Sequence, residues 1–123
     1  MVLPRVESDL LPLFASLKDQ KLNEVDLKIN PKSAATVMLV SGGYPEAYKK
    51  GIAMDGLEQS ANSLLFHAGT KMEDSNLVTN GGRVLAITSI ADDFKSAIVQ
   101  SMENANKINF EGKYFRTDIG FDL

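Results

Sequence analysis

The sequence has 123 residues, which suits one domain with its own hydrophobic core. Hydrophobic residues make up 44% of it and charged residues 24%, a globular composition rather than a disordered one. The net charge of −3 excludes a strongly basic nucleic-acid surface, and the absence of cysteine excludes disulfides and thiol nucleophiles. No apolar stretch is long enough for a membrane span. We therefore expect a cytoplasmic protein that binds neither nucleic acid nor membrane.

The first predicted helix begins at Ser8, whose hydroxyl suits an N-cap, and ends near residues 19–21. Its apolar side chains recur at helical spacing: Leu10, Leu13, Phe14 and Leu17. Residues 26–30 then alternate polar and apolar side chains, which predicts a half-buried strand.

A nearly continuous apolar run at 36–41 predicts a strand that is covered on both faces and leaves through the sequence GGYP at 42–45. Residues 46–56 are expected to form a turn of helix and an irregular loop, and residues 57–61 one short helical turn.

Residues 63–68 predict a strand, 71–76 a polar turn, and 77–79 the returning strand. Asn80-Gly81-Gly82 is a strong tight-turn signal, and a further apolar strand follows at 83–90.

Asp92 is expected to cap a second amphipathic helix, and the chain should end with a short strand, a turn at Gly112 and an extended piece. These elements predict an α+β fold, with four or more mostly antiparallel strands and two helices on one side.

Three glycine-containing corners are the best candidates for a ligand site: residues 42–45, 67–70 and 80–83. Glycine lets backbone N–H groups approach an anion, and Arg83 adds a planar fork that matches phosphate. The alternative is that all three are ordinary turns and that Arg83 is a surface residue at a strand edge. None has the spacing of a Walker loop or a dinucleotide fingerprint.

No catalytic constellation is visible in the sequence. His67 ends a predicted strand, where a lone histidine is either a structural hydrogen-bonding residue or a base. The loop carboxylates are too scattered to predict a metal site or an acid–base pair. We therefore assign neither a catalytic nor a metal-binding residue.

Five motifs in order resemble the C-terminal part of the phosphoribosylamine–glycine ligase (glycinamide ribonucleotide synthetase) family. They are LPRVESDL (3–10), SGGYPEAYKKG (41–51), FHAGTK (66–71), TNGGRVL (79–85) and FEGKYFRTDIG (110–120). Each motif alone is weak, but the ordered set covers essentially the whole chain.

The resemblance implies an ATP-grasp enzyme of de novo purine synthesis that joins phosphoribosylamine and glycine, with ATP and Mg²⁺ as cofactors. Glycine's carboxylate is first phosphorylated, and the phosphoribosyl amine then attacks the acyl phosphate to give glycinamide ribonucleotide, ADP and phosphate.

The family's FGDPE signature, expected just before Val2, is absent. The resemblance therefore implies an inactive C-terminal fragment that binds no cofactor itself. Residues 1–30 would be the last helix and exit of the ATP-grasp core, and 31–123 the C-terminal domain. The partner would be the remainder of the ligase chain, and the uncovered apolar helix face also favours self-association.

Carried over residue by residue, the resemblance makes Arg83 the expected contact for the ribose phosphate of phosphoribosylamine or glycinamide ribonucleotide. Gly42, Gly43, His67 and Asn80 would complete the substrate-binding set, whereas Arg116 and Asp118 are expected to form a structural ion pair. The alternative is an autonomous, non-catalytic module that binds a phosphorylated metabolite or a protein partner.

Overall fold

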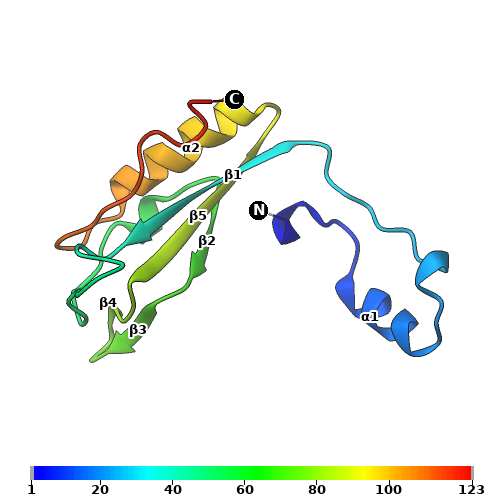
Figure 1. The fold of residues 1–123 in the computed structure, drawn as a ribbon, viewed down its shortest axis with the longest axis horizontal. Coiled ribbons are helices and arrows are strands. Elements are labelled where there is room, and N and C mark those ends of the chain that lie inside the picture. Colours follow the sequence, from blue (N-terminus) through cyan, green and yellow to red (C-terminus); the bar gives the residue numbers. More distant parts are fainter. Residues whose placement is uncertain (1, 123) are drawn as a thin grey trace. The chain divides into compact units, whose positions relative to one another are not determined.

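The computed structural model describes residues 2–122, which form two compact units, one ending at Lys32 and the other beginning at Ser33 (Figure 1). The first unit holds the 3₁₀ turns η1 (Leu3–Arg5) and η2 (Leu22–Glu24) and the helix α1 (Leu10–Lys18). Asp9, not Ser8, caps α1, because its carboxylate accepts the Leu11 N–H at 2.9 Å. The Ser8 hydroxyl instead bridges the backbone of Asp26 and Lys28.

The strand predicted at 26–30 is wrong: the segment forms only an isolated bridge between Val6 and Ile29. Its pairing segment is short, since η1 ends at Arg5 and α1 begins at Leu10. Residues 26–30 alternate as a strand would, but they have no partner segment long enough to form a ladder with them.

The second unit is built on a three-stranded antiparallel sheet in the order β1-β5-β2. These strands are β1 (Ser33–Val40), β2 (Ser63–His67) and β5 (Arg83–Ala91). A separate hairpin pairs β3 (Thr70–Glu73) with β4 (Asn76–Thr79). The polar turn predicted at 71–76 is thus too long, because only Asp74 and Ser75 make the turn, both at positive φ.

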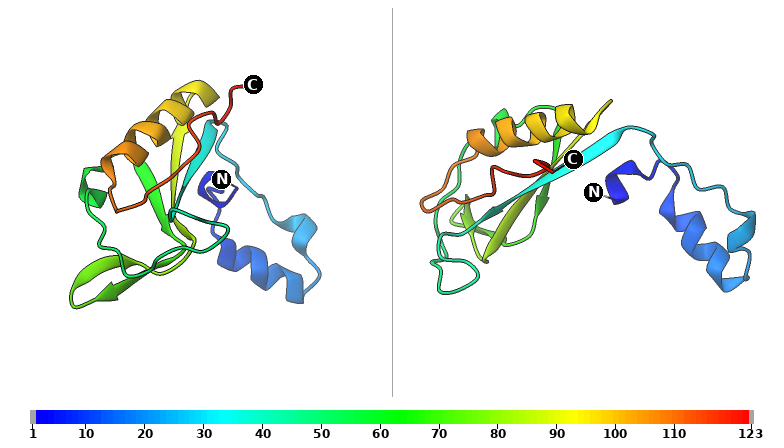
Figure 2. Two further views of the ribbon diagram at one scale, coloured as in Figure 1. Left: turned by 60° about the vertical axis from the view of Figure 1, so that its left-hand side comes forward. Right: turned by 45° about the horizontal axis from the view of Figure 1, so that its top comes forward.

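The helix α2 (Phe94–Lys107) lies across one face of this sheet, as both Figures 1 and 2 show. Asp93, rather than the predicted Asp92, caps it, accepting from the Ser96 N–H at 2.9 Å and the Ser96 hydroxyl at 2.7 Å. The expected helical turn within 46–56 is absent, whereas η3 (Leu57–Gln59) forms as predicted.

Strand register divides the sheet's side chains into two sets, because directly paired residues share a face. The covered face, toward α2, carries Ala35, Val37, Leu39, Ser63, Leu65, Leu85, Ile87 and Ser89. The opposite, open face carries Thr36, Met38, Val40, Leu64, Phe66, Ala86, Thr88 and Ile90.

The hydrophobic core lies between the covered face and α2. Its buried members are Val37, Leu39, Val84, Leu85, Ile87, Ala105, Ile108 and Phe110. Each fully buried aliphatic side chain of this kind contributes about 1.5–3 kcal/mol by leaving water. The α+β class and the antiparallel pairing are therefore confirmed, with α2 on the sheet and α1 in the first unit.

A polar network crosses this otherwise apolar layer. The Ser101 hydroxyl of α2 lies 2.8 Å from Ser89 Oγ and 3.1 Å from the Ala35 carbonyl oxygen. Ser63 Oγ lies 2.7 Å from Ser89 Oγ and accepts the Asn104 amide at 2.6 Å. Since hydrogen-bonded groups fit only one arrangement, this network fixes how α2 lies on the strands.

The chain after α2 returns along β1, where Tyr114 and Val40 exchange backbone hydrogen bonds of 3.0 and 2.9 Å. Neither helix within residues 2–122 is both long and apolar enough to cross a bilayer.

Candidate functional site

The three predicted glycine-containing corners meet at one end of the sheet. Because β5 runs antiparallel to both neighbours, its first residue lies beside the last residues of β1 and β2. The Ser41 N–H donates to the Gly82 carbonyl at 2.8 Å and the Ser41 hydroxyl to the Gly81 carbonyl at 2.9 Å. The Asn80 N–H donates to the Gly69 carbonyl at 2.7 Å. We call residues 41–45, 67–70 and 80–83 together the glycine corner.

Glycine is required here because the three backbones approach closely. A Cβ on Gly69 would lie 2.4 Å from the Arg83 carbonyl oxygen and 2.9 Å from Gly81 Cα. A Cβ on Gly82 would fall 2.0 Å from the Tyr44 ring, which packs against that backbone. The glycine corner is therefore a closely packed junction of three turns, which agrees with both the turn and the ligand hypotheses.

A β-bulge aims Arg83 at the open face. Leu39 pairs with Leu85, but the next residue, Val40, pairs with Arg83, so β5 holds one extra residue, Val84. Val84 joins the core, and Arg83 takes the face of Val40. Without the bulge, strict alternation would place Arg83 on the same face as Leu85.

Arg83 is also the arginine whose guanidinium is left available. The Arg5 guanidinium donates twice to the Asn30 carbonyl, at 3.1 and 3.0 Å. Arg116 forms the expected bidentate pair with Asp118, at 2.8 and 2.7 Å, and this pairing raises the pKa of Arg116 and lowers that of Asp118. The exposed Arg83 side chain makes no hydrogen bond or ion pair within residues 2–122.

The Ser41–Gly82 hydrogen bond joins the turn of Gly42 and Gly43 to the turn that precedes Arg83. Both glycines are exposed, and their N–H groups donate no hydrogen bond within the described residues. Asn80 is exposed on the adjoining turn. Free amides and a free guanidinium at one corner are the donor set that an oxyanion needs.

His67 belongs to the same corner but faces differently. It pairs with Leu85, which puts it on the covered side of the sheet end, and its Nδ1 lies 2.9 Å from Thr70 Oγ1. The structure thus places Arg83, Gly42, Gly43 and Asn80 at the same end of the sheet, whereas the His67 ring contacts Thr70.

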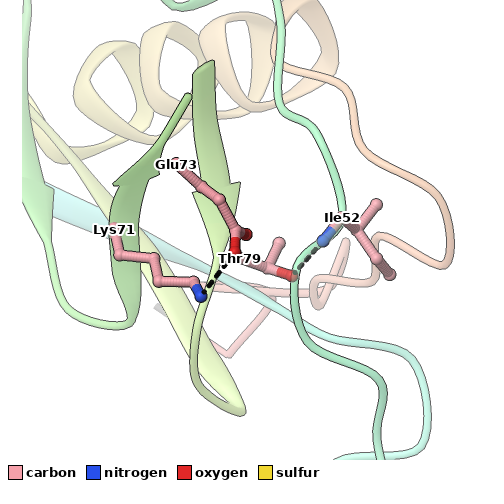
Figure 3. A network of polar contacts seen from close by, with 4 residues as sticks. All are labelled: Ile52, Lys71, Glu73 and Thr79. Atoms are coloured by element: carbon pink, nitrogen blue, oxygen red, sulfur yellow. Dashed lines mark hydrogen bonds and ion pairs between the residues drawn. The ribbon is translucent and has the colours of Figure 1, made fainter. Parts of the chain in front are cut away.

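The loop after the glycine corner is fixed to β4, as Figure 3 shows. The Ile52 N–H donates to Thr79 Oγ1 at 3.2 Å, and the Thr79 N–H donates to the Ile52 carbonyl at 2.9 Å. Nearby on β3, Lys71 Nζ lies 3.3 Å from Glu73 in an exposed ion pair. This loop borders an open pocket of about 430 Å³, lined in part by Gly42, Tyr48 and Glu111.

Lys113 holds the opposite wall of that pocket. Its ammonium donates to the Ala105 and Ile108 carbonyls at the end of α2, at 2.9 and 2.6 Å. Partial burial lowers the pKa of Lys113, and the charge of Asp55 opposes that shift. These hydrogen bonds fix the turn at Gly112, which lies directly against Gly42. A Cβ on Gly42 would lie 2.8 Å from the Gly112 carbonyl oxygen.

Ser41 and Tyr44 are site residues that the sequence did not single out. Ser41 is 2% exposed and ties two corners together, and Tyr44 packs on Gly82. The only signal for Ser41 is a polar residue that closes an apolar run directly before two glycines. Within residues 2–122, no three acidic, histidine or cysteine side chains are grouped so that they could bind a metal ion.

Residues 34–122 match the family model described as phosphoribosylglycinamide synthetase, C domain. Over 98% of its length the chain is 39% identical to a phosphoribosylamine–glycine ligase of Vibrio parahaemolyticus and 42% identical to that of Halalkalibacterium halodurans. It spans 28% of the length of each of these relatives. It is also 42% identical, over 96% of its length, to 15% of a bifunctional purine biosynthetic protein of Pichia angusta.

A solved structure with the same architecture is the phosphoribosylamine–glycine ligase of Thermotoga maritima. It superimposes with a TM-score of 0.69 at 33% identity, covering 85% of this chain and 27% of that one.

Proposed function

The chain belongs to the phosphoribosylglycinamide synthetase C-domain family, and we propose that it works as the C-terminal domain of a phosphoribosylamine–glycine ligase in purine biosynthesis. The support is that two bacterial ligases match 98% of the chain and a solved ligase structure covers 85% of it. This membership favours the ligase over the autonomous binding module that the sequence left open.

The reaction proposed for the whole ligase joins phosphoribosylamine and glycine at the expense of ATP, giving glycinamide ribonucleotide. ATP and Mg²⁺ supply the activation of the glycine carboxylate in that reaction. Residues 2–122 offer no carboxylate cluster that fits Mg²⁺, so we assign no chemical step to this chain. Its proposed role is to bind and orient the substrate.

We also propose that residues 1–30 end the ATP-grasp core and that 31–123 form the C-terminal domain. The boundary between compact units at Lys32 and Ser33 supports this division, as does the family match that begins at residue 34.

The proposed ligand site is a phosphate subsite at the glycine corner, and the free guanidinium of Arg83 is the observation that carries it. Arg83 would bind the ribose phosphate, and the amides of Gly42 and Gly43 would donate to its oxygens. Asn80 would contact the ligand from the adjoining turn. The phosphate does not react, so binding it would supply remote binding energy that the rest of the enzyme uses at the reacting centre.

We assign His67 to the edge of this subsite. Its Nδ1 is engaged by Thr70, so it would contribute through its other ring nitrogen or through the position of Gly69. Because His67 and Arg83 lie on opposite faces, replacing His67 should weaken ligand binding less than replacing Arg83 does.

An amide NMR titration with glycinamide ribonucleotide tests this proposal on the chain itself. We expect shifts confined to residues 42–44 and 80–83 at millimolar ligand, lost in Arg83→Ala. Arg116→Ala is the matched control, because its guanidinium is already paired with Asp118; it should leave the shifts intact.

Two results would contradict the proposal. One is the absence of any shift in the wild-type chain at millimolar ligand. The other is an unchanged pattern in Arg83→Ala, which would move the binding site away from the glycine corner while leaving the family assignment intact.

A further inference from the structure

On the open face of the β1-β5-β2 sheet, the β1 side chains border residues 114–119, whereas β2 carries two large apolar side chains that are exposed. Leu64 and Phe66, two residues apart on β2, are 48% and 45% exposed. They pair directly with Thr88 and Ala86. On the covered face, their strand neighbour Leu65 packs against the core, and its cross-strand partner Ile87 is fully buried. Large apolar side chains gathered on a sheet face mark an interaction site.

The edge beside these side chains is also open. In the order β1-β5-β2, β2 pairs only with β5, so its outer backbone groups are unpaired within the sheet. The other edge, β1, is bridged by Tyr114. An edge strand that carries exposed Leu and Phe has none of the charges or prolines that protect free edges in isolated domains.

From these observations we infer that the open face, centred on Leu64 and Phe66, is the surface on which the remainder of a phosphoribosylamine–glycine ligase packs. This inference rests on the proposed function above. The matching bacterial relatives are more than three times as long as this chain, which spans 28% of them, so each contains a large further segment able to cover the face.

The direction in which Arg83 points favours this occupant over a second copy of the chain. The bulge in β5 places Arg83 on the open face, at the end of the same surface. A ligand held by Arg83 must reach reacting groups that residues 2–122 do not supply, so the part that carries them has to approach from this side. A symmetric second copy would instead bring the same open face, which carries none of the missing reacting groups.

Binding of the chain to the complementary part of the Vibrio parahaemolyticus ligase, lacking its matching region, tests the inference by calorimetry. We expect Leu64→Asp and Phe66→Asp each to weaken binding by about tenfold or more, as interface anchors do. Val99→Asp is the matched control: Val99 is 56% exposed on α2, away from the open face, and its replacement should change affinity less than twofold. Leu64→Ser and Phe66→Ser replace any aspartate variant whose circular dichroism departs from the wild type.

Three outcomes would overturn the inference. The first is that the wild-type chain does not bind a partner that itself unfolds cooperatively. The second is that Val99→Asp weakens binding as much as Leu64→Asp does. The third is that sedimentation shows the chain alone forming a dimer that Leu64→Asp abolishes, which would make a second copy the occupant. The ligand titration needs no partner, so failure here would not be confused with failure of the phosphate subsite.

Discussion

The two faces of one small sheet differ in how far their side chains are buried and hydrogen-bonded. On the covered face, Val37, Leu39 and Ile87 are fully buried against α2, and the Ser63 and Ser89 hydroxyls are hydrogen-bonded. On the open face, Leu64 and Phe66 are nearly half exposed, and Arg83 has no partner within the described residues.

Alternation along the same three strands produces both faces. One therefore holds the groups that stabilise the fold, and the other holds the groups available to a ligand or a neighbouring segment. Substitutions on the covered face should cost stability, whereas those on the open face should cost binding.

The sharpest contrast compares Ile87→Ala with Leu64→Ala. Ile87→Ala should lower the free energy of unfolding by about 2–5 kcal/mol, because it leaves a cavity in a filled core. Leu64→Ala should cost less than about 1 kcal/mol, since the side chain is already half in water. Urea unfolding of both variants measures the difference, and equal losses would show that the open face is part of the stabilising core.

The polar network on the covered face gives the second prediction. Ser101→Ala should cost about 1–3 kcal/mol, because the Ser89 hydroxyl and N–H would lose a buried partner. Glu103→Ala, at an exposed position of the same helix, serves as control and should stay within about 0.5 kcal/mol of wild type. A Ser101→Ala variant as stable as this control would mean that apolar packing alone holds α2.

The helix cap gives the smallest effect and one that depends on pH. Hydrogen bonds from the Ser96 side chain and N–H lower the pKa of Asp93. A carboxyl with a lowered pKa in the folded chain stabilises it above the unfolded pKa of about 4, and this contribution is lost as the pH falls through the lower, folded value.

Thermal unfolding at several pH values measures this effect. Asp93→Ala should melt a few degrees below wild type at neutral pH, with the difference shrinking in acid. Asp93→Asn keeps the acceptor without the charge and should lose less. A difference that stays constant down to acid pH would contradict the role given to the Asp93 charge.

Local sequence signals located most strands, both helices and all three glycine-containing corners. Those signals are short-range: apolar runs, glycine pairs and capping side chains act within a few residues. Each helix is capped one residue after the predicted cap, by Asp9 and Asp93, and at α1 the reason is that a second segment engages the Ser8 side chain. Ser8 bonds to residues 26 and 28.

The remaining features depend on long-range pairing. Nothing near residues 26–30 indicates that their partner is too short for a ladder. The direction of Arg83 depends on the bulge opposite Leu39 and Val40, which lie more than 40 residues earlier. Strict alternation from Leu85 would have placed Arg83 on the covered face. The sequence could therefore identify Arg83 as a candidate but could not predict the face on which it lies.

The most direct test of the account is unfolding of the chain with and without millimolar glycinamide ribonucleotide. A ligand that binds only the folded state raises its stability by mass action. The account predicts that wild type and Arg116→Ala gain stability with the ligand, whereas Arg83→Ala, as stable as wild type without it, gains none. If Arg83→Ala gained as much as wild type, or if wild type gained nothing, the division into a stabilising face and a binding face would be wrong.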